Sequence, residues 1–382
     1  MLRAIIASVL LSTAAMTMAN AASLDPQKVA VIDRYVASEM QRQRIPGLAL
    51  GVYVNGSIVL AKGYGLANIE LNVPMTPDSV LQSGSVGKMF TATAVMMLVE
   101  QGRVGLNDSI SRYFPEGPYS WRRIKVANLL SHTSGLAAFD TEDLQKPGGP
   151  FDIRADFTED ELVEGITELP IEFRPGTRYK YQNTNYVLLG ILIHRVTGQF
   201  YGDFLKQRIF EPIGMKSSRV ISDIDIVPNR SAGYEIVKGK LQNQAWVSPT
   251  FNSTADGALY FTINDLEHWD RALYGESLLK ARSLQKMWTP FPVGGVPSAD
   301  GYGFGWGIDH VNGHRVVEHD GAWQGFSTWL SRYLDDKLTV IVLTNLDADN
   351  TSPEVIGRGI AGIVNPDLAT APLAAAAPEK SE

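Results

Sequence analysis

Strand-forming sequence lies near the two ends of this 382-residue chain, and helix-forming sequence lies between them. Near the N-terminus, two β-rich runs flank Asn55-Gly56, a dipeptide typical of a tight hairpin turn. Towards the C-terminus, four further runs are predicted to be successive strands, at 305–309, 315–319, 327–334 and 338–343. The simplest fold that pairs such distant segments is one antiparallel sheet built from both chain ends, with a mostly helical part inserted.

The helical part is expected to surround one buried helix. Residues 89–101 are apolar on nearly every side, which is typical of a helix at the centre of a fold. The other predicted helices are 25–43, 186–196, 262–273 and 353–364. We therefore predict an α/β (α+β) fold. Its domains are a discontinuous sheet domain (22–84 and 291–368) and a mostly helical domain (85–290).

The N-terminal segment has the pattern of a secretory signal peptide. One positive charge, Arg3, precedes a short apolar run, and Ala19-Asn20-Ala21 is a small-x-small cleavage site. Residues 1–21 are therefore predicted to be removed, which places the mature protein in the periplasm or outside the cell. No later stretch has the roughly 18 apolar residues of a membrane span, and the Ala/Pro-rich residues 369–382 are predicted to be disordered.

Composition excludes several kinds of chemistry. The chain has no cysteine, so it has no disulfide, thiol nucleophile or thiolate metal site. Its six histidines form no H-E-x-x-H motif, and we expect neither a metal nor another cofactor. The net charge is −7 and no long basic stripe is present, so nucleic acid is not an expected partner.

The first candidate for catalysis is Ser85-Val86-Gly87-Lys88, at the start of the apolar helix. Residues three apart in a helix share one face, so the lysine amine can lie beside the serine hydroxyl and act as its base. The helix start also supplies backbone N–H groups to an oxyanion. The same spacing occurs at Ser277/Lys280 and Ser283/Lys286, but those pairs lie in mixed polar sequence.

The second candidate is Tyr181-Gln182-Asn183, in a predicted loop. A phenol beside cations can be held as a phenolate and act as a general base, and the Asn183 amide can orient the nucleophile or a substrate carbonyl. A rival match at 53–55 places its asparagine in the hairpin turn.

The third candidate is His319-Asp320-Gly321, at the end of a predicted strand. Gly321 would let a substrate backbone approach the strand closely, and the N–H of Ala322 could be a second oxyanion donor. The rival Lys146-Pro147-Gly148 contains a proline, which disfavours an interior strand position.

In these motifs the sequence resembles the serine β-lactamase and penicillin-recognising family, in its class C branch. That branch includes D-alanyl-D-alanine carboxypeptidases, D-aminopeptidases and β-lactamase-like esterases. The resemblance extends from about Asp25 to Val364. Besides the three motifs it is carried by Gly-Tyr-Gly-Leu-Ala at 63–67, Leu-Leu-Ser-His-Thr-Ser-Gly-Leu at 129–136, Pro-Gly-Thr at 175–177, Asp-Gly-Ala-Leu-Tyr at 256–260 and Tyr-Gly-Phe-Gly-Trp-Gly at 302–307.

The resemblance implies a β-lactamase/transpeptidase-like fold with the site in a cleft between its two parts. Ser85 would be the acylated nucleophile, Lys88 and Tyr181 would share its proton, and Asn183 would touch the acyl amide. The amides of Ser85 and Ala322 would form the oxyanion hole. His132 is similar to a family position that is structural, and we expect it to hydrogen-bond a loop.

The expected activity is that of a secreted serine hydrolase that cleaves an amide or ester through an acyl-enzyme. Dedicated class C β-lactamases have Lys-Thr-Gly where this chain has His319-Asp320-Gly321, and an acid facing the cleft there would repel a substrate carboxylate. Efficient penicillin hydrolysis is therefore not expected. The expected partner is a small molecule or short peptide. The alternatives are a D-aminopeptidase or D-alanyl-D-alanine carboxypeptidase acting on peptidoglycan peptides, or a non-catalytic peptide or penicillin receptor.

Overall fold

The computed structural model describes residues 23–297 and 299–370. The predicted signal peptide and residues 371–382 of the predicted disordered tail lie outside the described residues. Within the described ranges, no helix is long and apolar enough to cross a membrane.

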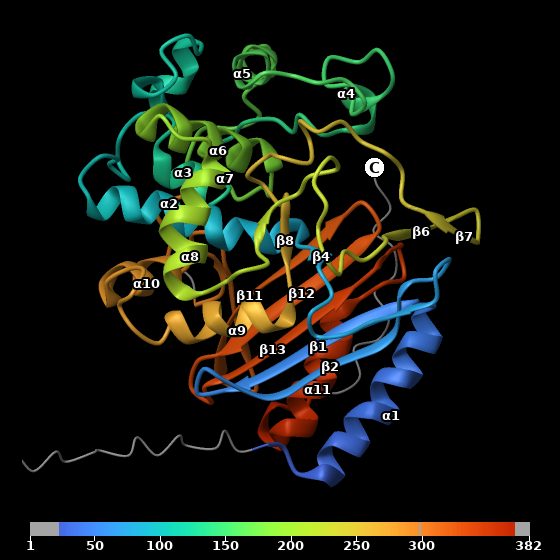
Figure 1. The fold of residues 1–382 in the computed structure, drawn as a ribbon. Coiled ribbons are helices and arrows are strands. Elements are labelled where there is room, and N and C mark those ends of the chain that lie inside the picture. Colours follow the sequence, from blue (N-terminus) through green and yellow to red (C-terminus); the bar gives the residue numbers. More distant parts are fainter. Residues whose placement is uncertain (1–22, 298, 371–382) are drawn as a thin grey trace, which may run out of the picture.

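The chain forms one large antiparallel sheet from its two ends, as predicted (Figure 1). In spatial order its strands in the described ranges are β3 (Val73–Pro74), β2 (Ser57–Asn68), β1 (Gly47–Val54), β13 (Leu338–Thr344), β12 (Phe326–Tyr333), β11 (His314–Trp323), β10 (Gly307–Val311) and β9 (Gly301–Tyr302). The two ends meet where β1 pairs with β13, with Leu48 opposite Thr344. The Asn55-Gly56 hairpin joins β1 and β2, and Asn55 has the positive φ of 53° that such a turn needs.

Both faces of this sheet are buried, so strand side chains alternate between two hydrophobic clusters. Leu48, Leu50 and Val52 face helices α1 (Pro26–Gln43) and α11 (Pro353–Val364), which cover one side (Figure 1). Ala49 and Tyr53 point the other way, and that face packs against α9 (Ile263–Ala272) and the helical part. Burial of each such large side chain contributes about 1.5–3 kcal/mol, which fixes the strand register.

The helical part is arranged around α2 (Lys88–Glu100), which is buried along nearly its whole length. It packs against α6 (Asn183–Thr197) and α7 (Tyr201–Leu205). The other helices are α3 (Val126–Leu130), α4 (Glu142–Gln145), α5 (Glu159–Thr167), α8 (Glu211–Ile213) and α10 (Ala281–Met287). Short strands make two small sheets: β4 (Leu81–Gln82), β8 (Leu259–Phe261) and β5 (Arg219–Val220), and β14 (Leu346–Asp347), β6 (Tyr234–Val237) and β7 (Lys240–Asn243).

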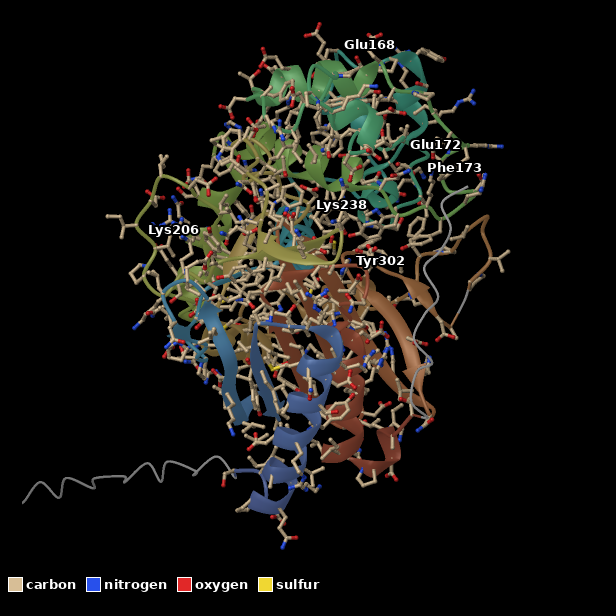
Figure 2. All side chains as sticks on the ribbon, turned by 90° about the vertical axis from the view of Figure 1, so that its right-hand side faces the viewer. Glu168, Glu172, Phe173, Lys206, Lys238 and Tyr302 are labelled. Carbon is tan, nitrogen blue, oxygen red and sulfur yellow. The ribbon has the colours of Figure 1, made fainter. Side chains whose placement is uncertain are left out.

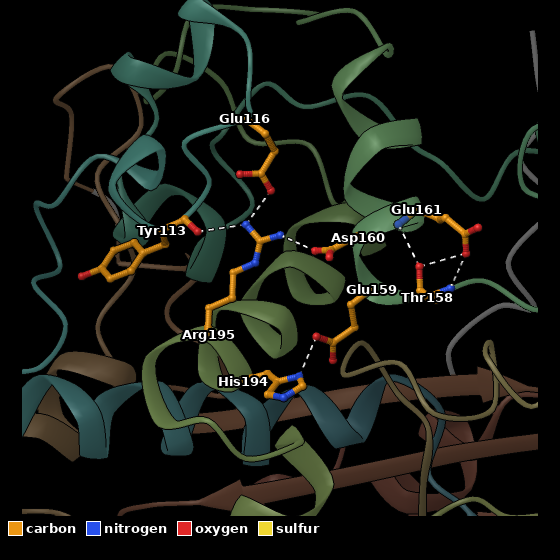
Figure 3. A network of polar contacts seen from close by, with 8 residues as sticks. All are labelled: Tyr113, Glu116, Thr158, Glu159, Asp160, Glu161, His194 and Arg195. Atoms are coloured by element: carbon orange, nitrogen blue, oxygen red, sulfur yellow. Dashed lines mark hydrogen bonds and ion pairs between the residues drawn. The ribbon is translucent and has the colours of Figure 1, made fainter.

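At the far side of the helical part, ion pairs join α6 to its neighbours (Figure 3). Arg195 donates to Glu116 at 2.5 Å and to Asp160 at 2.8 Å, and His194 lies 2.7 Å from Glu159. Arg195 is thus matched by two acids, although each exposed pair contributes at most about 1 kcal/mol.

The structure differs from the predicted elements at two places that bear on the site. Ser85 does not open α2 but lies in a separate 3₁₀ turn, η1 (Gly84–Gly87), and the α-helix begins at Lys88. Strand β11 runs to Trp323, four residues beyond its predicted end, so His319, Gly321 and Ala322 are all strand residues.

Candidate active site

The 3₁₀ turn brings Ser85 and Lys88 together. Such a turn has three residues per turn, so side chains three positions apart lie on the same side. The Lys88 Nζ donates to the Ser85 Oγ at 2.9 Å. The turn is possible because Gly84 adopts a positive φ of 48° and a Cβ there would lie 2.5 Å from the Ala322 nitrogen.

Lys88 is completely buried, and its ammonium is held by three acceptors. Besides Ser85, these are the Asn183 Oδ1 at 2.7 Å and the backbone oxygen of Asp256. An ammonium has three donors, so its hydrogen-bonding capacity is filled. The Lys88 position is therefore fixed within reach of the serine hydroxyl.

Burial lowers the pKa of Lys88 to about 8, because the charged form loses its hydration. Three carboxylates act in the opposite direction, namely Asp256, Asp140 and Asp320. The effect of burial is larger, so about one amine in ten is neutral at pH 7 and can accept a proton.

Tyr181 lies in the loop before α6, as predicted, with the centroid of its ring 5.0 Å from the Lys88 Nζ. Its hydroxyl makes no hydrogen bond of ordinary geometry to any described residue. Burial raises the pKa of this phenol well above its ordinary value, while the nearby Ser85 hydroxyl acts in the opposite direction. The free protein therefore holds a neutral phenol, not the phenolate suggested by the sequence, because desolvation penalises the anion.

His132 supports this loop. It is a buried residue with a positive φ of 54°, and its ring lies 4.2 Å from the Tyr181 ring, centroid to centroid. Its Nδ1 accepts from the backbone N–H of Gln182 at 3.2 Å. Burial lowers the pKa of His132, so the ring is neutral and acts as an acceptor. This is the loop hydrogen bond that we expected.

Asn183 connects the buried lysine to an acid that sequence analysis missed. Its Oδ1 accepts from Lys88, and its Nδ2 donates to the Asp140 Oδ2 at 2.6 Å. The sequence analysis assigned no role to Asp140, which is one of several acids between residues 140 and 161. It is in fact half-buried at the site. Charge patterning along the chain could not separate it from its neighbours, because only the packing of the loop onto α6 brings it inward.

His319 lies in the cluster of aromatic rings beside Tyr181, but its own nitrogens are occupied. The Nδ1 lies 2.6 Å from the Asp320 backbone oxygen, and the Nε2 lies 2.8 Å from the Tyr302 hydroxyl. Burial lowers the pKa of His319, so the ring is neutral and donates from Nδ1 while accepting at Nε2. Figure 2 shows Tyr302 at the level where the helical part meets the sheet. His319 thus supplies no positive charge.

Gly321 permits the close approach of the serine turn. A Cβ at this position would lie 2.4 Å from the Ser83 oxygen and 2.8 Å from the Ser85 nitrogen. The glycine therefore lets the serine turn pack against β11, and the approach of a substrate backbone stays a prediction. Thr328 strengthens this contact by donating to the Ser83 oxygen at 2.7 Å. As a result, Ser85 and Ala322 line the same hollow, where their amides are the candidate oxyanion donors.

The hollow is bordered by residues from four distant segments. Its walls are formed by Gly84, Ser85, Asn183, Phe251, Thr254, Asp256, Gly257, Ala258, Ala322 and Trp323. Asp256 was missed as a site residue, although it lies in one of the strings that carried the resemblance. Its Oδ1 is buried without a hydrogen-bond partner among the described residues. Trp323 forms a wall and donates to the Asn252 Oδ1 at 3.0 Å, whereas Phe326 is a core residue.

The rival motifs lie elsewhere. Ser283 is in α10 and donates to Glu100, and Ser277 lies outside any described helix. Lys146, in the third rival motif, forms an exposed ion pair with Asp143. Across the part of the chain that the structure describes, no group of three or more potential metal ligands is found.

The chain is similar to known proteins in sequence and in fold. The family model for Beta-lactamase matches residues 32–364. Penicillin-binding protein 4* of Bacillus subtilis (strain 168) is 29% identical over 327 residues, which cover 79% of this chain and 70% of that protein. The chain spans 66–70% of the length of such curated relatives.

Solved structures show the same fold. The octameric penicillin-binding protein homologue from Pyrococcus abyssi has a TM-score of 0.76 and 27% identity, covering 88% of this chain and 77% of that one. The D-amino acid amidase from Ochrobactrum anthropi SV3, complexed with L-phenylalanine amide, has a TM-score of 0.74 and 25% identity, covering 90% and 97%. Together with the family match over most of its length, this shows that the chain belongs to the β-lactamase family of penicillin-binding-protein-like serine hydrolases.

Proposed function

We propose that this protein hydrolyses an amide or ester bond through an acyl-enzyme on Ser85. The observation that carries the proposal is the contact between the Ser85 hydroxyl and the buried Lys88 amine, with Tyr181 beside it. A serine hydroxyl is a poor nucleophile at neutral pH and needs an adjacent base. In this site the base is an amine whose pKa burial lowers to about 8.

In the first half-reaction, neutral Lys88 takes the hydroxyl proton as the Ser85 Oγ bonds to the substrate carbonyl carbon. The amides of Ser85 and Ala322 stabilise the resulting oxyanion. The carbonyl re-forms and the bond to the leaving group breaks. The proton held by Lys88 passes to that group, with the neutral Tyr181 phenol as the relay. In the second half-reaction, neutral Lys88 takes a proton from water, with Tyr181 as the relay, as the water oxygen bonds to the acyl carbon. The bond between that carbon and the Ser85 Oγ then breaks, the Oγ takes the proton back from Lys88, and the carboxylic acid product leaves.

The charges around the site favour one class of substrate. Asp140, Asp256 and Asp320 all act on Lys88, while neutral His319 contributes no cation. A carboxylate on the substrate would therefore meet net negative charge, whereas an ammonium would be attracted. We propose an amine-bearing amide or peptide, or a neutral ester, as the substrate, in preference to a penicillin. That a similar structure is a D-amino acid amidase supports this choice.

We also propose that the protein acts outside the cytoplasm after residues 1–21 are removed. N-terminal sequencing of protein from the cell envelope or medium tests this. A mature chain beginning near residue 22 supports it, and an intact Met1 in the exported fraction contradicts it.

The test of activity combines labelling with a substrate panel. A fluorophosphonate probe should label the wild-type protein and fail to label Ser85→Ala. Ser277→Ala is the matched control, since it removes a serine with the same lysine spacing, and it should retain the label. D-alanine p-nitroanilide and p-nitrophenyl butyrate should be hydrolysed faster than nitrocefin or a D-Ala-D-Ala peptide. Absence of both label and turnover would identify a non-catalytic receptor.

A further inference from the structure

A second recess, in the helical part, is lined by positive charge. It has a volume of about 500 Å³, and its walls are Asn107, Ser109, Arg122, Arg123, Lys125, Arg174 and Pro175. Four of these seven residues are cationic and none is acidic. This is unusual in a chain whose net charge is −7. The recess and the hollow at Ser85 share no lining residue.

The four cations have no acidic partner in the described part of the chain, in contrast to other cations of the same lobe. Arg195 is paired with two carboxylates (Figure 3), and Lys180 is paired with Glu172 at 2.8 Å. In the recess, Arg122 instead lies over the exposed Tyr119 ring, at 4.7 Å from its centroid. The Lys125 Nζ donates to the Asn107 amide oxygen, at 3.3 Å, and not to a carboxylate of the described residues. Their charge is therefore available to a ligand.

Backbone contacts hold these like charges close together. Trp121 and Ile124 are fully buried, so the residues between and beside them, Arg122, Arg123 and Lys125, are directed outward. An isolated β-bridge pairs Lys125 with Ser109, and the Ile110 N–H donates to the Ile124 oxygen at 2.9 Å. These backbone contacts thus hold the cations of the recess in place without a carboxylate partner among the described residues.

Arg174 reaches the recess from a separate loop, which is also anchored. Its carbonyl accepts from the Thr177 N–H at 3.1 Å, and the Gly176 N–H donates to the Thr133 oxygen at 2.8 Å. Figure 2 places Glu172 and Phe173, just before Arg174, on the same side of the molecule as Tyr302. Two anchored segments therefore present guanidinium groups to one volume, and guanidinium forks bind phosphate and carboxylate oxygens in pairs.

We propose that this recess binds a phosphate-type anion carrying two or more negative charges, at a site separate from Ser85. The ligand would be a free oligophosphate or the phosphate headgroup of a lipid, which share the chemistry that the arginines recognise. A multivalent anion is required because a single charge would leave most of the wall unneutralised.

Calorimetric titration with inorganic pyrophosphate at low ionic strength tests this. The wild-type protein should bind one pyrophosphate, and added salt should weaken binding. The double variant Arg123→Gln/Arg174→Gln should bind at least about tenfold more weakly, since each charge-assisted hydrogen bond contributes appreciably. The matched control Arg34→Gln/Lys216→Gln removes two exposed cations that do not line the recess, and it should bind pyrophosphate as the wild type does. Equal thermal unfolding temperatures show that both variants are folded.

Sedimentation with cardiolipin vesicles, whose headgroup carries two phosphates, distinguishes the two sources of the anion. Vesicle binding that pyrophosphate displaces, and that the recess variant loses, identifies a lipid headgroup. Saturable binding of pyrophosphate alone identifies a free ligand. The proposal is overturned if neither binds, or if the recess and control variants lose binding equally. None of these outcomes depends on hydrolysis at Ser85.

Discussion

The pH dependence of hydrolysis is the sharpest consequence of the buried Lys88. Its pKa is lowered from 10.5 to about 8, and the neutral amine is the proposed base. At pH 7 about one amine in ten is then neutral, against roughly one in three thousand at the ordinary pKa. That difference of about 300-fold corresponds to about 3 kcal/mol of free energy.

The assay measures kcat/KM for p-nitrophenyl butyrate from about pH 5.5 to about pH 10, a range that includes the lysine pKa. This substrate has no titrating group, and Ser85→Ala supplies the blank for spontaneous hydrolysis. We expect kcat/KM to rise about tenfold from pH 6 to pH 7, to reach half its maximum near pH 8 and then to level off. Tyr181→Phe should lower the plateau while leaving the midpoint in place, because the phenol is neutral over this range.

Asp256→Asn provides a second, directional test. The Asp256 carboxylate raises the pKa of Lys88, so its removal should move the midpoint to lower pH. Asp143→Asn, which neutralises an exposed acid on α4, should leave the midpoint unchanged. A wild-type midpoint near 10.5, a flat profile, or a midpoint that moves upward in Asp256→Asn would refute the assignment of Lys88 as the base.

Three further predictions concern substrate charge, packing and stability. Asp320→Ser should raise kcat/KM for nitrocefin roughly twofold to fivefold relative to kcat/KM for p-nitrophenyl butyrate. The effect is this small because salt partly screens an exposed charge. The control Asp349→Ser should change kcat/KM for neither substrate. Gly321→Ala should lower the free energy of unfolding by about 1–3 kcal/mol, and with it the unfolding temperature. It should also lower the rate at which the fluorophosphonate labels Ser85. Gly275→Ala should be tolerated, because nothing lies within 4 Å of its added Cβ. The free energy of unfolding, measured against Lys88→Met, should increase by up to about 3 kcal/mol as pH rises from 8 to 10.5. Between these pH values the unfolded chain binds the proton that the folded chain has lost, and a flat difference would contradict the lowered pKa.

Hydrophobic periodicity and turn residues were sufficient to predict the sheet and its inserted helical part. The Asn55-Gly56 hairpin and the apolar 89–101 segment carry local signals, and both elements form where predicted. The sequence also selected Ser85, Lys88, Tyr181 and Asn183, and the structure brings their side chains together.

What the sequence could not supply were contacts that depend on tertiary packing. No role could be assigned to Asp140 or Asp256 from the sequence. They become site residues because the loop of Asp140 packs against Asn183 and the loop of Asp256 packs against Lys88. Gly321 was selected from the sequence for the approach of a substrate, and the structure shows a close contact with another part of the protein. Its partner, the serine turn, comes from the other end of the chain and is visible only once β11 and η1 are in contact.

The protonation states of Lys88 and Tyr181 also could not be predicted from the sequence, because burial shifts their pKa values in opposite directions. Removal of water destabilises the charged form of each, so it lowers the pKa of the Lys88 amine and raises that of the Tyr181 phenol. A single buried site therefore places an amine that can lose its proton near neutral pH beside a phenol that keeps its proton. The order of proton transfer follows: the amine must act first on Ser85, and the phenol can move a proton onward only after Lys88 has become an ammonium beside it.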